Sequence, residues 1–310
     1  MNSTTFLYKG KDNADIFAYK WLPEEGIEVK GIVQIAHGMA EYAGRYEHFA
    51  KALTDSGYIV YANDHRGHGN TAKGPEDLGF FAEKDGWDLI VEDVHLLSLI
   101  IKENHPQIPL FLFGHSMGSF ITRSYIQRYK EELNGAILCG TGMKSKREIA
   151  LGHAIASIQS KLIGKNKKSK LMDVLCFGKF SAQFYDKDTN FAWLTRDKEQ
   201  VEKYVSDPLC GCICTTGFFC DLLTGLREVN DPNNIKKISK KLPVLIISGD
   251  GDPVGNNGKD IMKLFHLYKE VGIEDVSYKL YKEARHELLN ETNKDEVIED
   301  VINWLKIHGK

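Results

Sequence analysis

The chain has 310 residues, a length that fits one large domain carrying an insertion, or two small domains. Charged residues at 27% and hydrophobic residues at 42% are ordinary for a soluble globular protein, and a net charge of −3 gives no case for nucleic-acid binding. Residues 1–6 lack the features of a signal peptide, no apolar run approaches the roughly 20 residues of a membrane span, and the six cysteines lack a secretory context. We therefore expect a cytoplasmic protein with reduced thiols.

In residues 1–142, short apolar runs alternate with longer segments of helical periodicity. This alternation predicts a mostly parallel sheet covered by helices. The expected strands are 5–8, 16–21, 31–36, 58–62, 109–113 and 136–139. The expected helices are 45–56, which Gly57 ends, then 87–103 and 118–129.

The alternation then fails for about eighty residues before it resumes. Residues 147–163 have one apolar helical face, and 171–185 and 192–204 are weaker helical candidates. Beyond them we expect strands at 243–248 and 276–281 and helices at 258–271 and 294–307. The sequence therefore predicts an α/β core domain, residues 1–142 and 230–310, with a helical cap inserted at 143–229.

The motif Gly114-His115-Ser116-Met117-Gly118 lies between an expected strand and an expected helix. Strand, Gly-x-Ser-x-Gly and helix in this order are typical of a nucleophile elbow, a sharp turn that presents the serine hydroxyl above the sheet. Gly114 and Gly118 would remove side chains that collide where strand and helix pack closely. The alternative is a glycine-rich turn in which Ser116 is a bystander.

Two further segments accompany the elbow in a recognisable order. His37-Gly38-Met39-Ala40-Glu41-Tyr42 follows the strand at 31–36, and Asp64-His65-Arg66-Gly67-His68-Gly69 follows the strand at 58–62. With the elbow, these segments make the chain resemble the α/β-hydrolase superfamily, and more narrowly its monoacylglycerol lipase and lysophospholipase branch. The resemblance extends from about residue 15 to the end and is weak between roughly 143 and 230. It implies an α/β-hydrolase fold with a helical cap, and serine chemistry.

A serine hydroxyl needs a base, and the base needs an orienting carboxylate. In the family these follow the serine in the order acid, then histidine. The segment after the strand at 243–248 contains two candidates for the acid, Asp250 and Asp252. The family pattern selects Asp252, and Asp250 is the fallback. Alternatively, both aspartates cap the next helix. His286 is the histidine of the loop after the strand at 276–281, and it is the expected base. His115 is expected to pack below Ser116.

Acyl transfer also needs two hydrogen-bond donors for the oxyanion. One should be the backbone N–H of Met117, directly after the serine. The resemblance points to the N–H of Met39, in the loop that contains Gly38, as the other. The alternative for this loop is a plain turn at the end of a strand.

The chemistry requires no metal or organic cofactor. Cys210, Cys212 and Cys214, with Cys220, do not match common zinc-ligand spacings, and their apolar neighbours indicate thiols used as small hydrophobic groups in a cap helix.

The resemblance implies hydrolysis of a carboxylic ester with one medium or long acyl chain, such as a monoacylglycerol or lysophospholipid, through an acyl-enzyme. The alternatives are a small-ester carboxylesterase, a serine aminopeptidase or amide hydrolase, and a non-enzymatic ligand-binding protein on the same scaffold. We expect no obligate protein partner.

Two features of the cap bear on substrate and partners, and each has two interpretations. Residues 143–170 contain eight Lys or Arg against Glu148 alone, so this segment is either a solvated face or a surface that contacts an anionic membrane. The apolar cap residues either line an acyl channel or dock the cap on the core. These residues form a stripe at Leu151, Ile155, Ile158 and Leu162 and a second cluster at Phe218, Phe219, Leu222 and Leu223.

Overall fold

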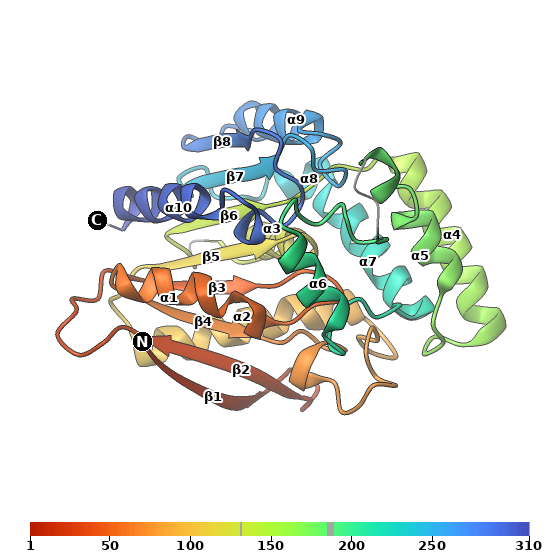
Figure 1. The fold of residues 1–310 in the computed structure, drawn as a ribbon, viewed down its shortest axis with the longest axis horizontal. Coiled ribbons are helices and arrows are strands. Elements are labelled where there is room, and N and C mark those ends of the chain that lie inside the picture. Colours follow the sequence, from red (N-terminus) through yellow and green to blue (C-terminus); the bar gives the residue numbers. More distant parts are fainter. Residues whose placement is uncertain (131, 185–188, 310) are drawn as a thin grey trace.

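The computed structural model describes residues 1–130, 132–184 and 189–309. Its strands are β1 (Asn2–Lys9), β2 (Asp15–Leu22), β3 (Gly31–Ala36), β4 (Tyr58–Asn63), β5 (Leu110–His115), β6 (Gly135–Cys139), β7 (Val244–Gly249) and β8 (Val276–Tyr281). They form one sheet in the order β1-β2-β4-β3-β5-β6-β7-β8 (Figure 1). β2 pairs antiparallel with β1 and β4, and all neighbours from β4 to β8 pair parallel. The expected mostly parallel sheet is confirmed.

Helices cover both faces of this sheet. The α-helices of the core are α1 (Glu47–Asp55), α2 (Gly86–Asn104), α3 (Met117–Arg128), α9 (Lys259–Glu270) and α10 (Lys294–His308). Short 3₁₀ helices lie at Ala43–Tyr46, Gly69–Thr71 and Leu288–Asn290, and another lies at Ser181–Gln183, between β6 and β7. α1 and α10 pack on the face to which β5 turns Phe111 and Phe113, whereas α2, α3 and α9 pack on the face that includes Leu112. Strands covered on both faces are buried along their length, and therefore they are apolar runs without alternation.

The segment between β6 and β7 contains α4 (Lys146–Ile163), α5 (Lys170–Phe177), α6 (Lys198–Ser206), α7 (Thr216–Val229) and the short α8 (Pro232–Ile235). α7 packs against both α3 and α4, and Figure 1 shows α4 and α5 at the end of the molecule away from both chain termini. We call residues 143–229 the insertion. That the insertion forms a separate cap domain stays a prediction.

Two helical predictions in the insertion are wrong in extent. The helix expected at 171–185 ends at Phe177, and residue 185 lies outside the described residues. The helix expected at 192–204 begins only at Lys198, because the carboxylate of Asp197 accepts hydrogen bonds from the N–H groups of Glu199 and Gln200 and so caps the helix there.

The apolar stripe of α4 does not point inward as one unit. Leu151, Ile158 and Leu162 are 65%, 60% and 78% exposed, whereas Ile155 packs against the core and Ile149 is buried. Both interpretations of this stripe, an acyl channel and a face that docks on the core, require covered side chains, and both are therefore wrong for three of its four residues. The second cluster, on α7, is buried as a whole: Phe218, Phe219, Leu222 and Leu223. In the described part of the chain, no helix has both the length and the apolar character required to cross a bilayer.

Candidate active site

Ser116 occupies a strained turn between β5 and α3. Its backbone angles, φ 51° and ψ −118°, lie in a region that residues other than glycine rarely adopt, and such strain persists at functional sites when the surroundings enforce it. A Cβ atom on Gly118 would lie 1.9 Å from the carbonyl oxygen of Ala36, and a Cβ on Gly114 would lie 2.3 Å from that of Gly118. The two glycines therefore allow β5, α3 and β3 to approach closely enough to form the turn.

The loops after β7 and β8 bring Asp252 and His286 together. Nδ1 of His286 lies 3.0 Å from Oδ2 of Asp252, and both side chains are buried. The carboxylate also accepts hydrogen bonds from Ser248 Oγ at 3.2 Å and from the N–H of Val254 at 2.8 Å. Asp250 is exposed and accepts instead from the N–H of Glu283 at 2.6 Å. Of the two aspartates that the sequence offered, Asp252 is the partner of the histidine.

The surroundings of His286 favour its protonated form. Burial by itself would lower the pKa of His286, but the charge of Asp252 and its hydrogen bond raise that pKa above the ordinary value. The imidazole lies between the rings of Trp193 and His115, with centroid distances of 4.9 Å and 4.8 Å. Burial, and then the charge of His286, lowers the pKa of His115 to about 3, so His115 is a neutral neighbour at physiological pH.

The loop that follows β3 lies beside Ser116. A Cβ on Gly38 would be 3.3 Å from Cβ of Ser116. His37 Nδ1 donates to the carbonyl oxygen of Gly38 at 2.7 Å, while its Nε2 accepts from the N–H of His65 at 2.9 Å. These two bonds fix the loop that carries Met39. Met117 is the first residue of α3, where helical N–H groups have no acceptor within the helix. The assignment of the N–H groups of Met39 and Met117 as oxyanion donors stays a prediction.

A buried ionic network under the site was not anticipated. Arg45 donates to Glu41 at 2.5 Å and forms two hydrogen bonds of 2.8 Å with Glu287, the residue after the candidate base. Glu41 accepts in turn from the N–H of Gly38 at 2.6 Å. Burial raises the pKa of Glu287, but Arg45 more than offsets this and lowers it to about 2. Arg45 therefore joins the loop of Gly38 to the loop of His286.

The cysteines lie partly elsewhere than expected. Cys210, Cys212 and Cys214 precede α7, and Cys220 lies within it. Cys212, Cys214 and Cys220 pack with one apolar cluster and Cys210 with another. Over residues 1–130, 132–184 and 189–309, no group of three or more His, Cys, Asp or Glu side chains is arranged to hold a metal ion.

Comparison with known proteins places the chain in a family. The model of the Hydrolase_4 family, described as serine aminopeptidase, S33, matches residues 27–293. The chain belongs to this family. It is 30% identical to a monoacylglycerol lipase of Mycolicibacterium smegmatis, over 93% of this chain and 91% of that protein. It is 25% identical to human monoglyceride lipase, over 94% and 88% of the two chains.

The solved structures that this chain resembles also include a carboxyl esterase and a monoglyceride lipase. A thermostable carboxyl esterase from Bacillus coagulans, in complex with glycerol, matches with a TM-score of 0.91 at 27% identity, over 100% of both chains. A soluble variant of the Saccharomyces cerevisiae monoglyceride lipase, in complex with a substrate analogue, matches with a TM-score of 0.77 at 25% identity, over 97% and 94%. The resemblance to α/β-hydrolases of the monoglyceride lipase branch is therefore confirmed.

Proposed function

We propose that the protein hydrolyses carboxylic esters by acyl transfer through Ser116, with His286 as the base and Asp252 as its orienting acid. Ser116 Oγ attacks the ester carbonyl carbon while His286 accepts the hydroxyl proton. His286 then passes that proton to the leaving alcohol, and an acyl-enzyme remains on Ser116. Water attacks the acyl-enzyme, His286 accepts a proton from it, and the carboxylic acid leaves as the serine recovers its proton.

The observation that carries this proposal is the pairing of His286 with the buried carboxylate of Asp252, with the imidazole packed against the ring of His115, the residue before the strained elbow serine. The bond from Nδ1 to Asp252 fixes the imidazole tautomer and leaves Nε2 as the base. The N–H groups of Met39 and Met117 would stabilise the oxyanion, at roughly 3–4 kcal/mol for each donor in comparable sites.

Single substitutions test these assignments. Ser116→Ala and His286→Ala should each abolish ester turnover, and the double variant should be no worse, because members of a triad act as a unit. Asp252→Asn should lose most of the activity, whereas Asp250→Asn is the matched control and should retain it. Greater damage from Asp250→Asn would show that the acid is wrongly assigned.

We propose a single-chain lipid ester, a monoacylglycerol or lysophospholipid, as the substrate. The supporting observation is an apolar cluster that continues from the candidate oxyanion residues into the insertion: it contains the side chains of Met39 and Met117 together with Met172, Phe218 and Leu223. Since each buried methylene contributes roughly 0.8 kcal/mol, an acyl chain that enters this cluster would gain about fourfold in affinity per carbon.

Acyl length is the variable that tests the substrate. Catalytic efficiency on single-chain glyceryl esters should rise over several carbons from acetyl upward, and lysophosphatidylcholine alongside reports the head-group preference. A maximum at acetyl would identify a small-ester carboxylesterase instead.

An aminopeptidase is the alternative that the family description raises. Recognition of a free amine needs an available carboxylate, and Glu41, Glu287 and Asp252 are each engaged with Arg45 or His286. Ester turnover should therefore exceed cleavage of amino-acid p-nitroanilides; the reverse order would favour the peptidase.

We further propose transient contact between the insertion and an anionic lipid surface. α4 and α5 expose an apolar face, made of Leu151, Ile158, Leu162, Ile163, Leu171, Val174 and Leu175. Exposed basic side chains, among them Lys146, Arg147, Lys161 and Lys170, lie on the same two helices. An apolar helical face flanked by cations is typical of binding at a membrane interface.

Co-sedimentation tests this contact. The protein should bind vesicles of phosphatidylcholine with phosphatidylglycerol better than vesicles of phosphatidylcholine alone, and Leu162→Gln with Leu175→Gln should weaken binding. Equal recovery with both vesicles, or no effect of the substitutions, would contradict the proposal.

A further inference from the structure

Residues 192–197 of the insertion lie along the loop that carries His286. The N–H groups of His286 and Glu287 donate to the carbonyl oxygens of Trp193 and Leu194, at 3.4 Å and 2.7 Å. Arg285 Nη1 donates to the carbonyl oxygen of Ala192 at 2.6 Å. Three consecutive residues of the loop thus find acceptors in the insertion.

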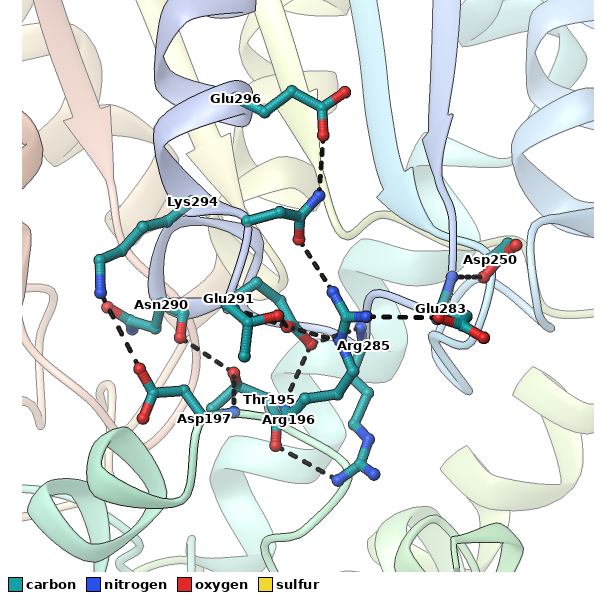
Figure 2. Close-up of polar contacts among 12 residues, drawn as sticks. Thr195, Arg196, Asp197, Asp250, Glu283, Arg285, Asn290, Glu291, Lys294 and Glu296 are labelled. Carbon is teal, nitrogen blue, oxygen red and sulfur yellow. Dashed lines mark hydrogen bonds and ion pairs between the residues drawn. The ribbon is translucent and has the colours of Figure 1, made fainter.

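Glu291 closes this contact, as Figure 2 shows. Its carboxylate is fully buried. Oε1 accepts from the N–H groups of Arg285 and Arg196, at 2.9 Å and 3.0 Å. Oε2 accepts from Nε of Arg196 and from the N–H of Thr292, both at 2.9 Å. Because a buried charge is stable only when it is paired and hydrogen-bonded, four donors from both segments hold this carboxylate in one place.

Further hydrogen bonds join the same two segments. Thr195 Oγ1 donates to the carbonyl oxygen of Asn290 at 2.9 Å (Figure 2). Arg196 Nη2 donates to Oδ1 of Asn293 at 2.9 Å. The ring of Trp193, from the same segment, packs against the imidazole of His286. The insertion therefore supplies one wall of the histidine's surroundings, and Glu291 fixes that wall to the loop.

We propose that Glu291 is a positioning residue for His286: through Arg196 it locks residues 192–197 of the insertion against the loop 285–291. The proposal rests on the role of His286 given above. Asp252 fixes the imidazole at Nδ1, but the backbone that carries the ring is held by the insertion. A displacement of about 1 Å in such a site can cost about 100-fold in rate, so loosening the loop should lower kcat with little effect on KM.

Substitution of Glu291 and Arg196 tests the proposal. Glu291→Gln keeps the shape but replaces one acceptor oxygen by an NH₂ group that faces donors, and we expect kcat to fall by about 10- to 100-fold with KM nearly unchanged. Arg196→Met should give a smaller fall in kcat, because the backbone donors to Glu291 remain, and Arg196→Lys should recover part of it. Asp300→Asn is the matched control: Asp300 is a partly exposed carboxylate on α10 that accepts hydrogen bonds from Lys279 and Tyr281, outside the contact between the two segments, and its loss should leave kcat unchanged.

A spectroscopic readout separates positioning from stability. The proton between His286 Nδ1 and Asp252 should give a low-field NMR resonance that disappears in His286→Ala, and it should broaden or shift in Glu291→Gln and Arg196→Met. If these two variants lower the unfolding temperature but leave kcat and this resonance as in the wild type, Glu291 is merely structural and the proposal is wrong. If Glu291→Gln does not fold, Arg196→Met alone decides by the same criteria. Ester turnover that survives Ser116→Ala would refute the proposed function instead, and the resonance would still test the positioning.

Discussion

Removal of Arg45 should unmask the cost of two buried carboxylates under the active site. Arg45 is 12% exposed, and its partners Glu41 and Glu287 are 4% and 5% exposed. Arg45→Met keeps much of the side-chain volume but removes the charge and all three hydrogen bonds. Glu41 and Glu287 would then remain buried without their counter-ion.

The pKa of Glu287 sets the scale of this effect. Burial raises that pKa, but Arg45 brings it from an ordinary 4.5 to about 2. The pair with Arg45 therefore stabilises the charged form of Glu287, and breaking a buried pair typically costs about 3–5 kcal/mol. Burial raises the pKa of Glu41, and the charge of Arg45 opposes that rise. The loss of Arg45 therefore also destabilises the charged form of Glu41, and this lowers the free energy of unfolding further.

The pH dependence follows from these directions. In the wild type, the contribution of Glu287 is complete above about pH 4.5 and is lost as the pH falls toward about 2. In Arg45→Met, burial should hold the pKa of both carboxyls above their unfolded values, so the cost is present at neutral pH and disappears as the pH falls toward 4.5. The stability gap between the two proteins should therefore narrow from pH 7 to pH 5.

Urea unfolding followed by tryptophan fluorescence at pH 5, 6 and 7 measures this gap. Lys51→Met is the control, because Lys51 forms an exposed pair with Asp55 and should leave stability unchanged. Arg45→Met combined with Glu41→Gln and Glu287→Gln should recover much of the loss. A gap that stays constant with pH, or no recovery in the triple variant, would refute the reasoning.

Three further predictions concern the site. The catalytic efficiency kcat/KM should rise with pH through a midpoint above 6.5, because His286 acts as a base only after it loses its proton and its pKa is raised. Asp252→Asn should lower the pH of this midpoint. An unchanged midpoint in that variant would contradict the pairing of His286 with Asp252. Gly118→Ala should lower the free energy of unfolding in urea by at least about 1–3 kcal/mol, because the new Cβ would meet the carbonyl oxygen of Ala36. Gly152→Ala is the control and should leave stability unchanged or raise it. Gly152 lies within α4, and a Cβ there would be 3.4 Å from its nearest neighbouring atom. Elemental analysis should find no stoichiometric zinc or iron, and chelators should leave activity unchanged; about one metal per chain, lost with Cys212→Ser, would overturn this.

The parts of the fold and site that could be predicted depend on local constraints. The elbow is local, because Gly114 and Gly118 are required by atoms within a few residues or on the adjacent strand β3. The strands of the sheet interior are continuous apolar runs, which the sequence displays directly. The choice of Asp252 over Asp250 came from the family pattern, which places the acid three residues after a glycine and just before a Pro-Val-like pair. Only the fold reveals that Asp252 is buried and Asp250 exposed.

The parts that could not be predicted depend on contacts between distant segments. Periodicity identified an apolar face on α4, but it does not say whether another element covers that face, and Leu151, Ile158 and Leu162 are exposed. Arg45 and Glu287 are 242 residues apart, and Glu291 and Arg196 are 95 apart. Their charges resemble those of surface residues in the sequence, and only the fold reveals that they are buried and paired.

The most direct test of serine catalysis is the site of covalent labelling by a fluorophosphonate probe. Such a probe reacts with a hydroxyl that a neighbouring base activates, so a ligand-binding protein on the same scaffold would not react. We predict one adduct per chain, located on Ser116 by peptide mass spectrometry, absent from Ser116→Ala and formed far more slowly in His286→Ala. Ester turnover should disappear in proportion to labelling. Labelling at another residue, or turnover that persists after Ser116 is fully modified, would contradict the account.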